Sequence, residues 1–143
     1  MKMENARPDN TVPVQPGVHD FTDLVTWKSA RILRTSIYTM CRRFPKQETF
    51  ELSSQIRRAA VSMTANLAEG YGWFSYQENI QFCRQSRGSV YELRDHLTTA
   101  LDAGHITPDE YKENDLQAVS VVRLINGYNR AAKQRKLQAD ARK

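Results

Sequence analysis

The chain has 143 residues, a formal net charge of +5 and only two cysteines. This length is enough for one domain whose core needs no disulfide or metal to stabilise it. Cys41 and Cys83 both fall inside helical patterns, which argues against a disulfide framework and indicates reduced thiols that fill core space. No apolar run approaches the length of a membrane span, and residues 1–4 do not begin a signal peptide. We therefore expect a cytoplasmic protein with no membrane partner.

The positive charge is concentrated at the C-terminal end. Between Arg130 and Lys143 there are six basic residues and one acid, Asp140, so the residues before Arg130 are neutral overall. A basic tail can bind phosphate backbones without sequence preference. It can equally be a solvated helix end whose charges complement the helix dipole. The sequence alone leaves both interpretations open.

Residues 1–19 contain prolines and a glycine and show no hydrophobic periodicity, which predicts a flexible N-terminal arm. A first helix begins near Thr22 or Asp23, either of which can cap it, and ends at Phe44 because Pro45 follows. Its apolar positions recur every three or four residues, as one buried face requires. They are Leu24, Trp27, Ala30, Leu33, Ile37, Cys41 and Phe44.

The second predicted helix begins between Glu48 and Ser53. Its narrow apolar seam consists of Ile56, Ala60, Met63 and Leu67. Small residues fill much of the rest, so neighbouring helices can approach closely along it. Gly70 is the expected stop, because glycine suits the left-handed position after a helix end.

The third and fourth predicted helices each begin with a capping signal. Ser75 and Glu78 form a capping box for the third helix, which stops at Gly104. Thr107, with Pro108 and Glu110 after it, opens the fourth helix in the same way. Buried positions of the third helix are Tyr76, Asn79, Phe82, Cys83, Ser86, Ser89, Val90, Leu93, Leu97, Ala100 and Leu101; those of the fourth are Tyr111, Ala118, Val121, Val122, Ile125 and Tyr128.

Four long helices, short connections and no strand pattern predict an all-α protein over residues 20–130. The economical arrangement is an antiparallel up-down-up-down four-helix bundle. Residues 131–143 then form the basic C-terminal tail.

Most of the folded part also matches a known family. The matching residues are Trp27, Lys28, Ala30, Phe44, Pro45, residues 55–60, Ser62, residues 66–70, Ser75, Glu78, Gly88, Ser89, Glu92 and Leu93. On these residues the chain resembles the bacterial four-helix-bundle proteins known as 23S ribosomal-RNA intervening-sequence proteins, over about residues 21–130. The paired arginine followed by an asparagine–x–alanine–glutamate–glycine end is the most specific part of the match.

The resemblance implies a homo-oligomer, a ring of five subunits. It also implies kinship with the accessory variability determinant of diversity-generating retroelements, which associates with a reverse transcriptase and with RNA. The family name records where some of the genes sit, so it does not by itself imply a ribosomal function.

The polar residues of the matching motif have a structural and a functional interpretation. In the structural one, an arginine of the pair bridges to Glu69 or Glu92 and fixes helix register, while Asn66 satisfies backbone groups near the helix end. In the functional one, the set forms a subunit contact or a nucleic-acid groove. We assign the structural role, since buried charges are stable when paired. The set is Arg57, Arg58, Asn66, Glu69, Gly70 and Glu92.

Other arginines form stripes on the first and third helices. Arg31 and Arg34 share one face, and Arg84, Arg87 and Arg94 share another. Such stripes could follow a phosphate backbone, especially in a ring, although an ordinary solvated face has the same pattern. With the tail included, the sequence predicts eight phosphate contacts: Arg31, Arg34, Arg84, Arg87, Arg130, Lys133, Arg135 and Lys136.

Four aromatic residues cluster at the bend between the second and third helices. They are Tyr71, Trp73, Phe74 and Tyr76. Aromatic rings beside arginines can stack on unpaired bases. We expect these four instead to close the end of the bundle or to lie in a subunit interface.

Nothing in the chain indicates catalysis. A di-iron bundle needs glutamate–x–x–histidine motifs on two helices, and the nearest pair, Glu92 and His96, is four residues apart on one helix. His19 and His105 are distant from it, Cys41 has no identifiable histidine partner, and there is no phosphate-cradling glycine loop. We therefore expect no enzyme activity, no metal and no cofactor.

These features predict a non-catalytic, oligomeric protein that binds RNA or DNA through phosphate contacts and acts as an accessory in a ribonucleoprotein. The alternative is an oligomeric protein–protein scaffold that binds no nucleic acid.

Overall fold

The computed structural model describes residues 17–73 and 75–143. They form four α-helices, two short 3-10 helices and no β-strand, which confirms the all-α, four-helix prediction. The α-helices are α1 (Val25–Cys41), α2 (Leu52–Gly72), α3 (Tyr76–Asp102) and α4 (Pro108–Ala141); the 3-10 helices are η1 (Phe21–Asp23) and η2 (Lys46–Glu48). Most of the predicted N-terminal arm, residues 1–16, lies outside the described residues.

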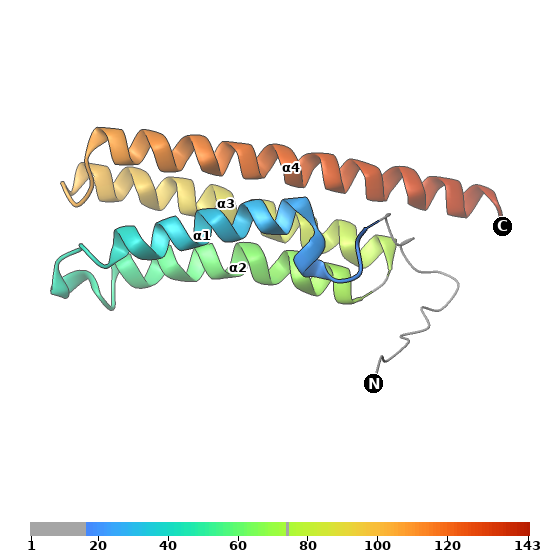
Figure 1. The fold of residues 1–143 in the computed structure, drawn as a ribbon, viewed down its shortest axis with the longest axis horizontal. Coiled ribbons are helices and arrows are strands. Elements are labelled where there is room, and N and C mark those ends of the chain that lie inside the picture. Colours follow the sequence, from blue (N-terminus) through green and yellow to red (C-terminus); the bar gives the residue numbers. More distant parts are fainter. Residues whose placement is uncertain (1–16, 74) are drawn as a thin grey trace.

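The four helices lie side by side along one long axis and share a core (Figure 1). Helix α1 contacts α2 and α4, and α3 contacts the same two helices. Leu33, Ile56, Leu93 and Ile125, one from each helix, are fully buried. Burial of each such side chain contributes about 1.5–3 kcal/mol, so the seams read from the sequence stabilise the bundle through apolar burial.

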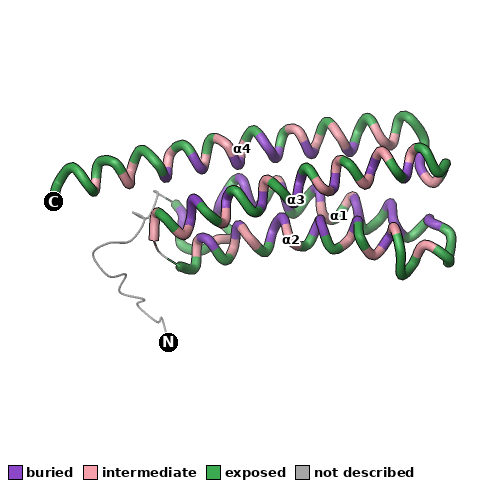
Figure 2. Tube along the Cα trace, turned by 180° about the vertical axis from the view of Figure 1, so that it is seen from behind, coloured by how far each residue is buried: buried purple, intermediate pink, exposed green. Residues whose placement is uncertain are grey.

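Helix α4 continues beyond the other three (Figure 1). It runs through the basic segment as far as Ala141, so most of the predicted tail is helical. Ala132 is its last buried residue, and the turns that follow are exposed or half-buried (Figure 2). The basic side chains of this segment are therefore carried on a helix that projects from one end of the bundle.

The connection between α3 and α4 agrees with the sequence prediction. Gly104 has φ +75°, the left-handed conformation expected after a helix end. The Thr107 hydroxyl accepts from the Glu110 amide at 3.1 Å, and the Glu110 carboxylate accepts from the Thr107 amide at 3.2 Å. This closed capping box, with Pro108 in the first turn, fixes the start of α4.

The ends of α1 differ from the prediction. Asp20 caps η1, and the Asp23 carboxylate accepts from the amides of His19 and Asp20, so α1 itself begins only at Val25. At the other end α1 stops at Cys41, where the Phe44 amide donates to the Cys41 carbonyl at 3.1 Å. This tight turn keeps Phe44 buried while the chain leaves helical geometry before Pro45.

The predicted capping box at Ser75 is wrong. Ser75 occupies the cap position of α3 with extended backbone, but its side chain makes no capping hydrogen bond. The sequence identifies residues able to form a box, whereas the box forms only if both side chains adopt the rotamers that turn back to the helix.

Gly70 is also not the helix stop that the sequence suggested. Helix α2 continues to Gly72, and Gly70 does not have a positive φ. A Cβ atom at Gly70 would lie 2.8 Å from the Cβ atom of Phe82 and 3.1 Å from the side-chain oxygen of Asn79, both on α3. Glycine is required here because the two helices approach each other closely.

We expect Gly70→Ala to destabilise the protein by about 1–3 kcal/mol, because the added methyl overpacks the contact with Phe82. The matched control is Gly88→Ala, where a Cβ meets no atom within 4 Å and alanine should be neutral or stabilising. Urea denaturation measures both free energies of unfolding. Equal stability of the two variants would contradict a close α2–α3 approach.

Both cysteines should be inert in the native protein. Burial raises the pKa of Cys41 to about 11 and that of Cys83 to about 12, so little thiolate is present at pH 8. We expect slow labelling by a disulfide reagent at pH 8 and rapid labelling after urea is added. The Cys41→Ala variant isolates Cys83; fast labelling of this variant in native buffer would show that the site is open.

Candidate nucleic-acid interface

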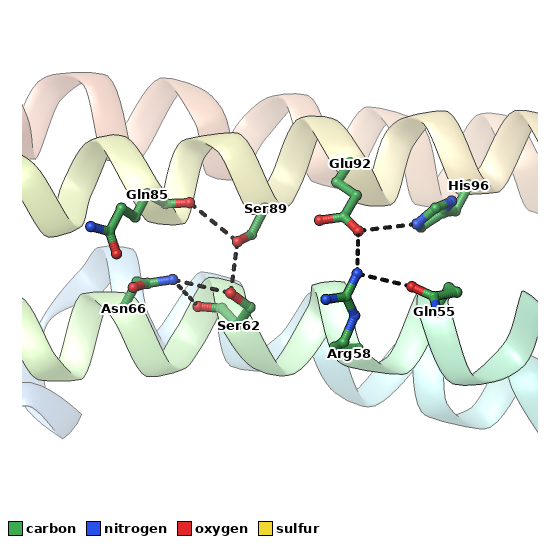
Figure 3. Close-up of polar contacts among 8 residues, drawn as sticks. All are labelled: Gln55, Arg58, Ser62, Asn66, Gln85, Ser89, Glu92 and His96. Carbon is green, nitrogen blue, oxygen red and sulfur yellow. Dashed lines mark hydrogen bonds and ion pairs between the residues drawn. The ribbon is translucent and has the colours of Figure 1, made fainter. Parts of the chain in front are cut away.

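Several polar side chains of α2 and α3, most of them in the resemblance noted above, contact one another between the two helices (Figure 3). Arg58 donates to Glu92 at 3.0 Å and to the Gln55 side chain at 2.9 Å, and His96 lies 3.3 Å from the same Glu92 oxygen. The bridge to Glu92 is one of the two expected from the sequence. It is largely exposed, so its contribution is small and its effect is mainly on helix register.

A second group of polar contacts crosses the same helix pair. Asn66 donates to the Ser62 carbonyl at 2.8 Å and to its hydroxyl at 3.1 Å. The Ser62 and Ser89 hydroxyls are 2.8 Å apart, and Ser89 donates to the Gln85 carbonyl. A hydroxyl has one proton, so Ser62 must donate to Ser89, giving one directed chain across the helices (Figure 3).

The remaining members of the predicted structural set are separate from this chain of contacts. Arg57 points to the other side of α2 and donates to the Thr49 carbonyl at 3.0 Å, as the angular offset of adjacent helical residues requires. Gly70 sets the approach of α2 to α3. Glu69 is exposed at the same end of α2.

Two further arginines are paired with carboxylates across helices. Arg43 forms an ion pair with Glu110, and this hydrogen bond lowers the pKa of the glutamate. Arg94, which the sequence placed on the third-helix stripe, binds Asp115 at 2.8 Å, and the contact raises the pKa of the guanidinium. Arg94 is thereby engaged in linking α3 to α4.

The predicted phosphate contacts on α1 are held by neutral groups. The guanidinium of Arg31 lies 5.6 Å from the Trp27 ring centroid, and that of Arg34 lies 6.0 Å from it. Arg34 also donates to the Thr64 hydroxyl of α2 at 2.8 Å. Neutral partners orient these side chains without cancelling their charge.

The predicted contacts on α3 are likewise not neutralised. Arg87 donates to the Asn126 amide oxygen of α4 at 2.9 Å, and Arg84 is exposed. The pairs Arg94–Asp115 and Arg87–Asn126 define how α3 and α4 align. The two helices are antiparallel, because a lower residue number on α3 is paired with a higher one on α4. This alignment places Arg84 opposite the turn that carries Arg130.

The two stripes therefore lie on different edges of the bundle. Arg31 and Arg34 belong to the α1–α2 edge, because Arg34 binds Thr64. The α3–α4 edge brings together Arg84, Arg87, Arg130 and Lys133, and we call this set the α3–α4 basic edge. Sequence periodicity gives the face of a helix but not the neighbour beside it, so the sequence could not separate the edges.

The last two predicted phosphate contacts, Arg135 and Lys136 on the helical tail, already interact with other groups of the protein. Lys136 forms an ion pair with Asp140 at 3.3 Å, one turn away. Arg135 is half-buried and has interactions of its own. Within the tail, Arg130 and Lys133 are the fully exposed members of the predicted set.

Charge is also divided along the long axis. The half of the bundle that carries the tail, residues 17–36, 60–73, 75–90 and 116–143, has twelve Lys or Arg and five Asp or Glu. The opposite half, residues 37–59 and 91–115, has seven Lys or Arg and nine Asp or Glu. The ion pairs of Arg43, Arg58 and Arg94 with carboxylates all lie in that second half. The tail end is thus a positive pole.

The α1–α2 edge contains a groove that the sequence did not reveal. It has a volume of about 350 Å³ and is lined by Arg34, Thr35, Tyr38, Thr39, Arg42 and Val61. Only Arg34 was predicted as a contact. The available signal was the recurrence of aromatic or basic residues at positions 27, 31, 34, 38 and 42, each about one helical turn from the next.

The aromatic bend is only partly packed. Tyr71 packs against the core and Tyr76 is half-buried, whereas Trp73 is exposed; Phe74 lies outside the described residues.

Among the described residues there is no group of His, Cys, Asp or Glu that could hold a metal ion. No helix in the described part of the chain could span a membrane.

Comparison with known proteins places this bundle in a family. Residues 22–127 match the model of the family described as 23S rRNA-intervening sequence protein. The match includes all of α1, α2 and α3 and the greater part of α4. A comparison with curated protein sequences gives no match. The four-helix architecture and the extent of the family match agree: the chain belongs to the 23S rRNA-intervening sequence protein family.

Proposed function

We propose that this protein is a non-catalytic, nucleic-acid-binding accessory protein whose phosphate-binding surface is the α3–α4 basic edge together with the helical tail. The observation that carries the proposal is the pairing pattern of the arginines. Arg43, Arg58 and Arg94 bind carboxylates, whereas within the described part of the chain the exposed Arg84 and Arg130 bind none and the half-buried Arg87 binds only the neutral Asn126. Cations that are exposed and unpaired are those able to exchange counterions for phosphates.

RNA is the polyanion in this proposal, which is consistent with a family description that refers to 23S rRNA, although that name records gene position. In this proposal the protein acts in the cytoplasm within a ribonucleoprotein, and a reverse transcriptase of a diversity-generating retroelement is the candidate protein partner. A ring of five copies would repeat the positive pole around one particle, which strengthens the field that attracts a polyanion.

A scaffold that binds only proteins is the second candidate. The observation in its favour is a pair of exposed apolar side chains, Val25 and Ile32, seven residues apart on one face of α1. Such a stripe suits a contact between subunits or with another helix. It would explain a contact between protein surfaces but not the positive pole.

The two candidates differ in the effect of removing charge. The variant Arg84→Gln/Arg130→Gln/Lys133→Gln neutralises three exposed cations of the α3–α4 basic edge. We expect it to weaken RNA binding at least about tenfold in low salt and to reduce the salt slope by about 2, at about 0.7 per lost contact with a single strand. Fluorescence anisotropy at several salt concentrations measures both quantities.

The matched control is Arg43→Gln/Lys46→Gln/Lys112→Gln, which removes the same charge from the opposite half of the bundle. It should bind RNA nearly as wild type. Equal weakening by the two variants would show that net charge alone acts and that the α3–α4 basic edge is not the site. If the wild-type protein binds no RNA at micromolar concentration in low salt, the nucleic-acid-binding proposal is wrong and only the protein–protein scaffold remains.

A further inference from the structure

The groove on the α1–α2 edge combines three kinds of side chain on a short length of helix. Tyr38 lies one turn from Arg34 and one turn from Arg42, so the α1 wall of the groove has a basic residue before and after the tyrosine. Thr35 and Thr39 complete the α1 wall, and Val61 of α2 lies opposite. Tyr38 is 38% exposed as a residue, so it is partly covered and partly open to a ligand.

The arginines of this groove keep most of their hydrogen-bonding capacity. Arg34 uses one donor on the Thr64 hydroxyl and lies near the Trp27 ring, which fixes its position. A guanidinium has five donors, so those that remain can bind an anion. Arg42 is exposed. The two arginines are eight residues apart, about 12 Å along the helix.

None of the described residues that line the groove is a carboxylate. Helix α1 contains no acid, and α2 contains none before Glu69 near its end. Two acids of the neighbouring helices are engaged away from the groove: Glu92 of α3 binds Arg58, and Glu110 of α4 binds Arg43. The groove's charged lining residues, Arg34 and Arg42, are both basic, and α1 and α2 also carry Arg31 and Arg57.

The chemistry of the groove suits a flexible polyanion that carries flat aromatic groups. An open groove with a partly exposed tyrosine can accept a base that has left its stack. In a duplex the base faces are covered by their neighbours, so Tyr38 would have no partner there. Basic residues before and after the tyrosine match phosphates on both sides of a base.

We propose that this groove binds one unpaired nucleotide of a single-stranded nucleic acid, its base on Tyr38 and its flanking phosphates on Arg34 and Arg42. The proposal rests on the proposed function and adds a selection that the α3–α4 basic edge does not provide. That edge attracts any phosphate backbone, whereas the groove discriminates unpaired strands from duplexes.

The test compares Tyr38→Leu with wild type, using the full chain, a labelled single-stranded RNA and the same strand annealed to its complement. We expect Tyr38→Leu to weaken single-strand binding about 5- to 150-fold, the loss of one base–aromatic stack, and to leave duplex binding unchanged. Tyr38→Phe should bind as wild type, because the ring remains. Tyr91→Leu, which removes an exposed tyrosine from α3, is the control and should have no effect.

Three outcomes would overturn the inference. Unchanged single-strand binding by Tyr38→Leu would exclude stacking of a base on Tyr38. An equal loss of affinity for the single strand and for the duplex would show that the groove does not discriminate between them. A change in particle mass by light scattering, with RNA binding unaltered, would make the groove a subunit contact. Each of these leaves the proposed function intact if wild type binds RNA in a salt-dependent way, whereas absence of binding by wild type would end both.

Discussion

The close approach of α2 to α3 is the constraint on which the rest of the bundle depends. Gly70 permits it, since a single methyl there would meet Phe82 at 2.8 Å. The hydrogen-bonded chain from Asn66 through Ser62 to Ser89 then fits between the helices, with short side chains that leave no buried group without a partner along it. Once α2 and α3 are aligned, α1 and α4 cover the two open sides of the core.

This arrangement also determines which charges are available. Carboxylates gather in the half of the bundle away from the tail, and they bind Arg43, Arg58 and Arg94 there. The cations at the other pole are oriented by neutral groups such as Trp27 and Asn126. An arginine that is positioned without being neutralised is suited to an external anion, because little ordering entropy is lost when the anion binds.

The sequence predicted the four helices and their buried seams because periodicity and capping are local properties. The Thr107 box and the Gly104 stop were correct for this reason. Gly70 was misassigned, because the role of a glycine in helix packing depends on a neighbour that the sequence does not identify. The same limit applied to the site: Arg31 and Arg84 look equivalent as stripes, and only tertiary packing assigns them to different edges. Tyr38 was missed because its signal, the recurrence of aromatic and basic residues at positions 27, 31, 34, 38 and 42, marks one face of α1 without showing that α2 closes a groove beside it.

The salt dependence of RNA binding by the unmodified protein tests the central claim most directly. The claim is that unpaired cations at one pole of a non-catalytic bundle bind phosphates. Anisotropy titrations of a single-stranded RNA over a range of potassium chloride should give log affinity falling linearly with log salt, with a slope of about −3 for four phosphate contacts. A slope near zero, or no binding in low salt at micromolar protein, would contradict it.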